Sequence, residues 1–283
     1  MKTVLLTGAT GFVGRQIAKW VTKAECNLVP VVRRGREAAV NKLSNVSRVV
    51  SSPDIFQETE TWWTDQCEGV DLVIHTAWYT SPGEYLQSSK NIDCLSGSLS
   101  LAKGATNAGI KRFVGIGTCF EYDLAAKILS VNTPLRPLTP YACAKASLFF
   151  GLDHWMKLQS VEFAWCRLFY LYGEGENEAR LVPYLHNRLA SGLEAKLTNG
   201  TQVRDFLDVL EAGRLITEIA MSDQQGPINI CSGVPITVRE LAEAIADKYG
   251  RRDLLKFGER AENLVDPPYV LGIPNSATPG KTW

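Results

Sequence analysis

Several features are scarce in this 283-residue sequence, and each absence excludes a class of protein. The 30 Lys and Arg residues equal the 30 Asp and Glu residues, and no segment concentrates basic side chains, so no nucleic-acid partner is expected. No window holds the roughly 18 apolar residues of a membrane span. Gly8, Gly11 and Arg15 interrupt the apolar run at the start, which argues against a signal peptide. We expect a cytoplasmic protein without a membrane partner.

The sequence also lacks the residue spacings that are typical of disulfide frameworks and metal centres. Its seven cysteines are scattered and form no C-x-x-C pair, which favours free thiols in a reducing compartment. The three histidines, His75, His154 and His186, lie far apart and have no metal-ligand spacing. We therefore predict no metal site.

The sequence does contain a regular alternation of strand-length apolar runs with helix-length patterns. The predicted strands are Val4–Thr7, Leu28–Val32, Arg48–Val50, Leu72–His75, Phe113–Ile116 and Phe163–Leu168. The predicted helices lie near 12–23, 35–44, 58–67, 84–108 and 140–157. Strands separated by helices require crossover connections, which produce a parallel sheet with helices on both faces. The pattern predicts an α/β fold of the Rossmann type, with a doubly wound parallel sheet.

After Tyr172 the alternation changes. Predicted helices near 179–191, 209–221 and 237–249 accompany short extended pieces such as Pro227–Cys231, and a tail near 266–283 is predicted to be irregular. We assign residues 1–172, with added segments near 207–231, to a first domain. Residues 173–283 are interpreted as mainly a smaller, partly interleaved substrate-binding region.

A glycine-rich loop follows the first predicted strand and opens the first predicted helix. A helix N-terminus offers unpaired N–H groups and a positive dipole end, and glycines let the backbone approach a pyrophosphate closely. The spacing is G-x-x-G-x-x-G, one residue longer in its first interval than the usual dinucleotide fingerprint. We assign to the dinucleotide the residues Gly8, Thr10, Gly11, Phe12, Val13 and Gly14.

The end of the second predicted strand indicates which dinucleotide is bound. An acidic residue there would select NAD, but this strand runs into Arg33 and Arg34 with no acidic residue recognised nearby. Two guanidinium groups suit a 2′-phosphate, which favours NADP(H), whereas the alternative is two solvated loop arginines. Asp54 and Ile55, after the third strand, are predicted to flank the adenine; Asp54 is alternatively a plain turn residue.

A tyrosine and a lysine at the start of a predicted helix form a candidate catalytic pair. Thr139 is a suitable N-cap, and Tyr141 and Lys145, four residues apart, share one helix face. A free tyrosine titrates at about pH 10, and a nearby ammonium lowers that pKa. We predict that Lys145 acidifies Tyr141 and also contacts the cofactor. Thr118, at the end of the fifth strand, is predicted to hydrogen-bond a substrate carbonyl; its alternative is a structural turn residue.

With these residues assembled, the chain resembles the extended short-chain dehydrogenase/reductase family, in particular its NAD-dependent epimerase/dehydratase (nucleotide-sugar) branch. Thr118, Tyr141 and Lys145 match the family's catalytic residues, and Asn91 falls on its supporting asparagine. The resemblance implies that the end of the fourth strand lies beside the cofactor. Thr76 and Ala77 are assigned to the cofactor for this reason, and Trp78 is assigned to the substrate. Asn91 and Leu168, which stands where the family commonly has a proline, are also assigned to the cofactor.

The resemblance also identifies substrate-binding residues. Arg204 belongs to a segment that resembles R-D-F/Y-x-x-V, whose arginine binds the pyrophosphate of a sugar nucleotide. Val182 belongs to a stretch that resembles the one near the nucleotide base. Tyr170 stands where an asparagine is common, which implies an altered sugar contact. The resemblance further implies a homodimer through the helices near 84–108 and 140–157, which are alternatively core helices.

These features lead to a specific hypothesis. Cys119 and Phe120 follow the catalytic threonine in place of the Asp–Glu pair of 4,6-dehydratases, which argues against dehydration. We expect NADPH-dependent reduction of the 4-keto group of a dTDP- or CDP-linked 4-keto-6-deoxyhexose, in deoxysugar or O-antigen-type biosynthesis. The alternatives are a nucleotide-sugar epimerase, with Cys119 or Tyr170 moving a proton; a reductase of small free carbonyl compounds; and a non-catalytic NADP-binding sensor.

Overall fold

Seven parallel strands form the central sheet of this protein, a computed structural model of which describes residues 1–262 and 267–275. The strand order is β11-β7-β5-β4-β1-β2-β3. In that order the strands are Gly226–Ile230, Glu162–Leu168, Arg112–Thr118, Leu72–His75, Thr3–Thr7, Asn27–Arg33 and Val50–Ser52. The chain order reverses on the two sides of β1, which is the switch point where open α/β sheets bind ligands. The predicted Rossmann-type fold is confirmed.

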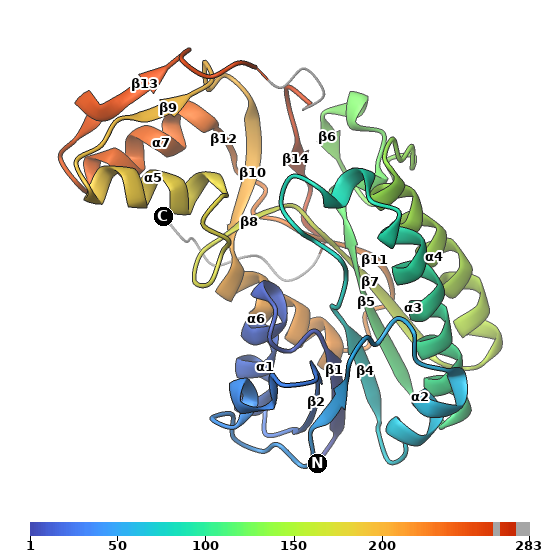
Figure 1. Cartoon of the computed structure of the whole chain (residues 1–283). Helices are drawn as coiled ribbons and strands as arrows, with labels where there is room; N and C mark the ends of the chain where they lie inside the picture. The colour runs from blue at the N-terminus through green and yellow to red at the C-terminus, as the bar shows by residue number, and fades with distance from the viewer. Residues whose placement is uncertain (263–266, 276–283) are drawn as a thin grey trace.

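Helices cover both faces of this sheet (Figure 1). On one face lie α1 (Phe12–Lys23) and α6 (Val209–Met221); on the other lie α2 (Glu60–Gln66), α3 (Lys90–Asn107) and α4 (Pro140–Leu158). Strand β1 shows why two layers are needed, because successive side chains of a strand point to opposite faces. Val4 and Leu6 belong to one buried core and Leu5 to the other.

A small lobe stands beside the carboxyl ends of the large sheet, at the upper left of Figure 1. Its three-stranded sheet has the order β12-β10-β8, from Pro235–Thr237, Val203–Asp208 and Tyr170–Tyr172. The lobe also contains α5 (Leu181–Ala190), α7 (Val238–Asp247) and the strand pair β9 (Ala195–Leu197) and β13 (Leu255–Phe257). A further pair joins β6 (Ile128–Leu129) to β14 (Leu271–Gly272). Between β10 and β12 the chain returns to the large sheet to form α6 and β11, and β11 pairs with β7.

Some predicted elements are placed correctly and others are not. The predicted strand Leu72–His75 has the observed bounds of β4, whereas the third strand lies two residues later than predicted. The helix predicted at 35–44 is wrong: only a single 3-10 turn, Glu37–Val40, forms after Gly35, whose φ of +84° lies in the left-handed region. The helix predicted near 84–108 begins only at Lys90, because the backbone of Ser88 is extended. Residues 276–283 of the predicted irregular tail lie outside the described residues.

Candidate active site

The glycine loop joins β1 to α1 at the carboxyl edge of the sheet. Gly8 has a φ of +68°, and a Cβ there would lie 2.6 Å from Oγ1 of Thr76 and 2.9 Å from the amide nitrogen of Ala77. A Cβ at Gly14 would lie 2.1 Å from the carbonyl oxygen of Gly8. Gly11 occupies the N-cap of α1, and no side chain in the described part of the chain caps that end. Glycine is therefore required for this turn, and the first-turn N–H groups suit a pyrophosphate.

The other predicted loop residues lie at the same turn. Thr10, Phe12 and Val13 are half-buried at the start of α1. The guanidinium group of Arg15 donates hydrogen bonds to the carbonyl oxygens of Gly11 (3.2 Å) and Thr10 (3.3 Å). Arg15 thus holds the backbone of the glycine loop, a role that was not predicted from the sequence.

Strand β4 ends beside the glycine loop. The buried imidazole of His75, in β4, contacts Thr7 directly before that loop. The ring nitrogens of His75 lie 2.7 Å from Oγ1 of Thr7 and 2.7 Å from Oγ of Ser98. Ser98 donates its own proton to the carbonyl of Cys94, so it accepts from Nε2 of His75, and Thr7 donates to Nδ1. Burial lowers the pKa of His75 to about 3, so the ring is neutral and structural.

Thr76 and Ala77 follow at once. The hydroxyl of Thr76 donates to the carbonyl of Thr7 at 2.6 Å, and the amide of Ala77 donates to the Thr7 hydroxyl at 3.3 Å. Both residues are half-buried and touch the Gly8 turn, as the assignment to the cofactor requires.

Arg33 and Arg34 lie exposed at the end of β2. An acidic residue also lies nearby, which corrects the statement that none does: Oε1 of Glu37 accepts hydrogen bonds from the hydroxyl of Ser51 (2.6 Å) and the amide of Gly35 (3.2 Å). These hydrogen bonds, with the charge of Arg34, hold the pKa of Glu37 below its usual value. Glu37 was not predicted from the sequence, because it lies beyond the end of β2 in a loop that folds back toward that end.

Asp54 and Ile55 follow β3 on the same edge. Oδ1 of Asp54 accepts a hydrogen bond from the amide of Phe56 at 3.0 Å, so the carboxylate closes its own turn. This is the alternative that the sequence left open for Asp54. Ile55 is half-buried against the core on that face of the sheet.

The three predicted catalytic side chains meet at the carboxyl edge of β5. Thr118 ends β5, and Tyr141 and Lys145 lie in the first turns of α4, which Thr139 caps as expected. The side chain of Thr118 acts on the phenol of Tyr141 and lowers its pKa. The ammonium of Lys145 donates to the carbonyl of Ile116 at 2.6 Å. The three side chains are almost fully buried.

The pKa of Tyr141 contradicts one expectation. We expected Lys145 to lower it, but it is raised well above its usual value, chiefly because burial disfavours the phenolate. Tyr85 and Glu121 raise this pKa further, and the side chain of Thr118 lowers it. Burial of the phenol is the largest influence on its pKa. The ammonium of Lys145 is directed at the backbone carbonyl of Ile116. The phenol is therefore protonated at neutral pH.

A buried ion pair supports this edge from behind. Oε2 of Glu121 accepts from Nε of Arg167 at 2.7 Å, and Oε1 accepts from the amide of Thr118 at 2.8 Å. Both oxygens also accept from the indole of Trp165 at 3.1 Å. A Cβ at Gly117 would lie 2.4 Å from the same carboxylate, so the turn is tightly filled. The T-x-x-E capping-box pattern was the available sequence signal for Glu121.

The ion pair continues into a hydrogen-bonded chain. Nη1 of Arg167 donates to the phenol of Tyr122 (3.1 Å), which donates to Oδ1 of Asn229 (2.7 Å). Asn229 in turn donates to the carbonyls of Leu129 and Ile273. This chain joins β5, β7 and β11 to the β6–β14 pair and makes the catalytic edge rigid.

Leu168, a predicted cofactor residue, ends β7 of the large sheet directly beside Thr118.

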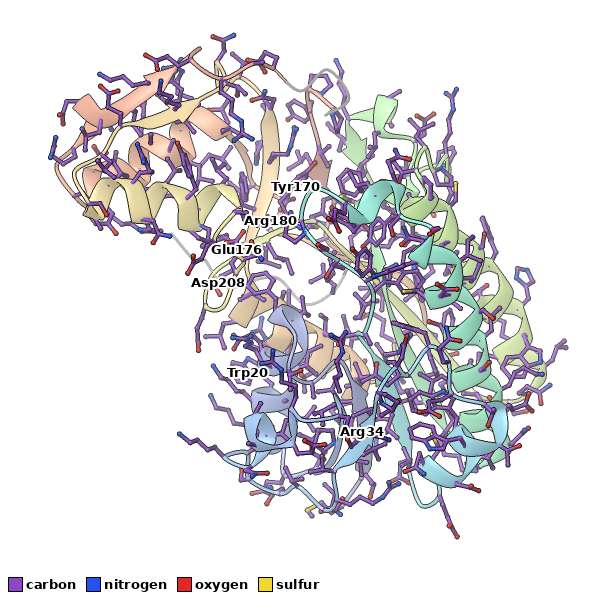
Figure 2. All side chains as sticks on the ribbon, viewed as in Figure 1. Trp20, Arg34, Tyr170, Glu176, Arg180 and Asp208 are labelled. Carbon is purple, nitrogen blue, oxygen red and sulfur yellow. The ribbon has the colours of Figure 1, made fainter. Side chains whose placement is uncertain are left out.

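The small lobe contributes two of the predicted substrate residues, Tyr170 and Arg204. The guanidinium carbon of Arg204 on β10 lies 5.1 Å from the ring centroid of Tyr170, and the Arg204 side chain is buried. Tyr170 also packs edge-to-face on Phe120. In Figure 2 Tyr170 lies near the junction of the lobes, well apart from Arg34 in the lower part of the molecule.

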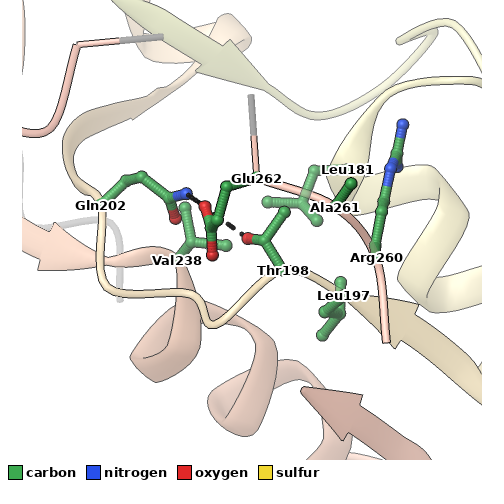
Figure 3. Close-up of a pocket in the computed structure, with 8 residues that line it drawn as sticks. All are labelled: Leu181, Leu197, Thr198, Gln202, Val238, Arg260, Ala261 and Glu262. Atoms are coloured by element: carbon green, nitrogen blue, oxygen red, sulfur yellow. Dashed lines mark hydrogen bonds between the residues drawn. The ribbon is translucent and has the colours of Figure 1, made fainter. Parts of the chain in front are cut away.

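A cavity of about 460 Å³ opens in the small lobe next to β10 (Figure 3). Gln202 and Glu262 on its wall share a hydrogen bond of 2.6 Å. Its lining residues are Leu181, Leu197, Thr198, Gln202, Val238, Arg260, Ala261 and Glu262. Val182, predicted to lie near the nucleotide base, packs between α5 and α7 and lines a second cavity of about 340 Å³. Its neighbour Leu181 lines the first cavity. Five separate segments build this wall, so sequence reasoning could not assemble it.

Cys119 lies in a different setting from the one its epimerase role would need. It is buried among apolar side chains, and burial raises the pKa of its thiol to about 12. A thiol of that kind transfers no proton near neutrality, so Tyr170 is the remaining candidate for the proton transfer of the epimerase alternative. Among the described residues no cluster of three potential metal ligands forms, and no helix is long and apolar enough to cross a membrane.

Comparison with known proteins agrees with this geometry. The model of the NAD dependent epimerase/dehydratase family matches residues 4–231. The chain belongs to this family. It is 24% identical, over 95% of its length and 98% of the relative's, to a dTDP-6-deoxy-L-talose 4-dehydrogenase (NAD(+)) of Aggregatibacter actinomycetemcomitans. It is 24% identical to a GDP-6-deoxy-D-mannose reductase of Pseudomonas aeruginosa, over 86% of this chain and 79% of that one.

Solved structures show the same fold. A UDP-N-acetylglucosamine 4-epimerase from Methanobrevibacter ruminantium superposes with a TM-score of 0.83 at 22% identity, over 97% of this chain and 90% of that one. A dTDP-glucose 4,6-dehydratase from Streptomyces venezuelae, solved with NAD, gives 0.81 at 20% identity, over 96% and 88%. This family member is therefore a nucleotide-sugar-modifying enzyme that uses a nicotinamide cofactor.

Proposed function

We propose that this enzyme reduces the 4-keto group of a dTDP- or CDP-linked 4-keto-6-deoxyhexose with NADPH. The observation that carries the proposal is the position of the Tyr141 phenol, which is buried with Thr118 and Lys145 at the carboxyl edge of the sheet and stays protonated because burial raises its pKa. Reduction of a ketone needs a proton donor, whereas oxidation of an alcohol needs a base. Two of the relatives are named as a 4-dehydrogenase and a reductase of nucleotide-linked 6-deoxyhexoses, which supports the same substrate class.

The residues present fit the cofactor, because Gly11 caps α1 without a side chain and the first-turn N–H groups of this helix can therefore donate to a phosphate. A bound nicotinamide supplies the hydride. Thr118 orients the carbonyl oxygen by hydrogen bonding, and Tyr141 donates its phenolic proton to that oxygen. Lys145 holds the cofactor ribose and compensates the charge that develops on the phenol.

We propose that the substrate's nucleotide lies in the small lobe. The cavity of about 460 Å³ falls in the size range of small-molecule sites; Arg260 offers donors to a base, and Oε1 of Gln202 offers an acceptor. Arg204, two residues after Gln202, would bind the diphosphate. A reductase of free carbonyl compounds would need neither group, so Arg204→Ala would leave its KM unchanged; we expect KM to rise.

We propose NADPH as the cofactor, on the strength of the exposed guanidinium groups of Arg33 and Arg34. A tightly held NAD is the second candidate, because the carboxylate of Glu37 lies at the same edge. NAD would favour a 4-epimerase, which oxidises and re-reduces its substrate. Identifying any dinucleotide released on denaturation of the purified protein separates the two: tight NAD would contradict the reductase.

We also propose a homodimer through α3 and α4. Ile92 and Leu99 on α3 and Phe150 on α4 are large apolar side chains that stand exposed on these neighbouring helices. Light scattering of the wild type should give the mass of two chains, and Phe150→Glu should give the mass of one.

Turnover is tested by following NADPH absorbance with dTDP- and CDP-4-keto-6-deoxyglucose. We expect oxidation of NADPH that requires the ketosugar. Folded protein that remains silent with every nucleotide-linked ketosugar would contradict the proposal and favour a non-catalytic NADP-binding sensor.

A further inference from the structure

Trp78 occupies a central position beside the catalytic pair. It follows β4, and the centroid of its indole ring lies 3.7 Å from Nζ of Lys145. The same ring stands edge-to-face to Tyr141, with centroids 6.4 Å apart. Trp78 therefore touches both residues of the pair, and its π face lies against the ammonium.

Asn91 fixes the orientation of this indole. Its Nδ2 donates to the carbonyls of Tyr85 (2.7 Å) and Ser88 (2.9 Å), so both donors are used. Its Oδ1 must then face outward from that turn, and it accepts the indole N–H of Trp78 at 2.8 Å. Asn91 is fully buried, so losing this hydrogen bond would be costly.

The ammonium of Lys145 depends on few groups for its charge. Burial lowers the pKa of Lys145 to about 7, and Glu121 and Cys94 raise it. His75, the remaining titratable neighbour from β4, is neutral, and Tyr141 on the same helix is protonated. The carbonyl of Ile116 and the face of Trp78 also favour the cation, and the ring of Trp165 lies farther away, with its centroid 5.9 Å from Nζ.

We propose that Trp78 is a positioning residue for Lys145: its indole, clamped by Asn91, holds the ammonium at the catalytic edge and favours the protonated form. Asn91 thus acts on Lys145 through Trp78. The catalytic consequence rests on the proposed function, but the effect on the lysine itself does not, since it requires no substrate.

The test is an NMR titration of ¹³C-labelled lysines in the full-length protein without substrate, with Lys145→Arg assigning the signal. Trp78→Leu removes both the π face and the clamp, and we expect the pKa of Lys145 to fall by about half to one unit, from the energy of a buried cation–π contact. Trp78→Phe keeps an aromatic face but loses the N–H, so a smaller fall is expected. Trp155→Leu, half-buried further along α4, is the matched control and should change nothing.

The role of Asn91 is tested by a double-mutant cycle on the same titration. Asn91→Ala should lower the pKa of Lys145 as Trp78→Phe does, and the double variant should lower it no further, because both variants lose the same hydrogen bond between Asn91 and Trp78. Additive falls would show that Asn91 acts without Trp78. An unchanged Lys145 titration in folded Trp78→Phe or Trp78→Leu would overturn the proposal. Absence of turnover with normal shifts would count against the proposed function alone.

Discussion

The two ends of the candidate site are built differently. At the catalytic end Thr118, Tyr141 and Lys145 are nearly inaccessible, and a buried ion pair lies directly behind them. At the adenosine end Arg33 and Arg34 are exposed on a loop after β2. Charges and hydrogen bonds are strong where water is excluded and weak where it is not. The chemistry of the enzyme should therefore be rigidly fixed, and its choice of cofactor should be easily changed.

The largest effect is expected at Tyr141. Tyr141→Phe removes the proton donor with almost no change in volume, so kcat should fall about 10²- to 10⁴-fold while the unfolding midpoint stays near that of the wild type. NADPH oxidation and thermal unfolding measure the two quantities. Tyr249→Phe, which alters a phenol bonded to His186 in the small lobe, is the control and should keep full activity. Full activity of Tyr141→Phe would refute its role.

The next largest effect is on stability, at the ion pair. Glu121→Gln leaves the guanidinium of Arg167 buried without a countercharge, and breaking such a pair costs about 3–5 kcal/mol. Urea denaturation should show this loss, and Glu121→Gln with Arg167→Met should recover part of it. Lys157→Gln, which breaks an exposed pair with Asp153, should change stability little. If Glu121→Gln and Lys157→Gln lowered the unfolding free energy equally, the buried ion pair would be no stronger than an exposed one, which would contradict the account.

Lys145 should make stability depend on pH. Its folded-state pKa of about 7 lies below its ordinary value of 10.5, so between these pH values the unfolded chain binds the extra proton. The unfolding free energy should therefore rise with pH in this window. Lys145→Met should be more stable than the wild type below pH 7 and should lose this slope. A parallel pH profile for the two proteins would show that the lysine is not buried as described.

The smallest effect is expected at the exposed end. Arg34→Ala should lower the preference for NADPH over NADH about 10-fold, the value of one charge-assisted hydrogen bond. The effect should shrink in high salt. Glu37→Gln is the matched change of opposite sign and should raise the same ratio. If Arg34→Ala leaves the ratio unaltered, the two arginines are only solvated loop residues.

The sequence predicted the sheet well because its strands are short apolar runs with separators that are easy to recognise. It predicted where Thr118, Tyr141 and Lys145 would gather, since the carboxyl ends of parallel strands share one edge. The direction of the Tyr141 pKa was wrong, because burial depends on side chains such as Tyr85 that arrive from a distant turn. A helical spacing shows that two residues share a face, but not how much water reaches them.

Other features depend on folding that no local pattern encodes. The helix expected at 35–44 failed because three apolar residues, Ala38 to Val40, do not outweigh the turn at Gly35. The hydrogen bond between Asn91 and Trp78 joins the first turn of α3 to the loop after β4, 13 residues away in the sequence. The cavity near Gln202 needs segments from 181 to 262. Such contacts are visible only in three dimensions.

The central claim is that the sugar C4 receives a hydride from NADPH, which is released as NADP after each turnover. Tyr141 supplies the proton. Turnover of a nucleotide-linked 4-keto-6-deoxyhexose with NADPH deuterated at the nicotinamide C4 tests it most directly, with the product examined by NMR and mass spectrometry. The account predicts one deuterium at the sugar C4 for each NADP formed, and incorporation about 10²- to 10⁴-fold slower in Tyr141→Phe. A product inverted at a sugar carbon, with no deuterium and no net consumption of NADPH, would contradict it.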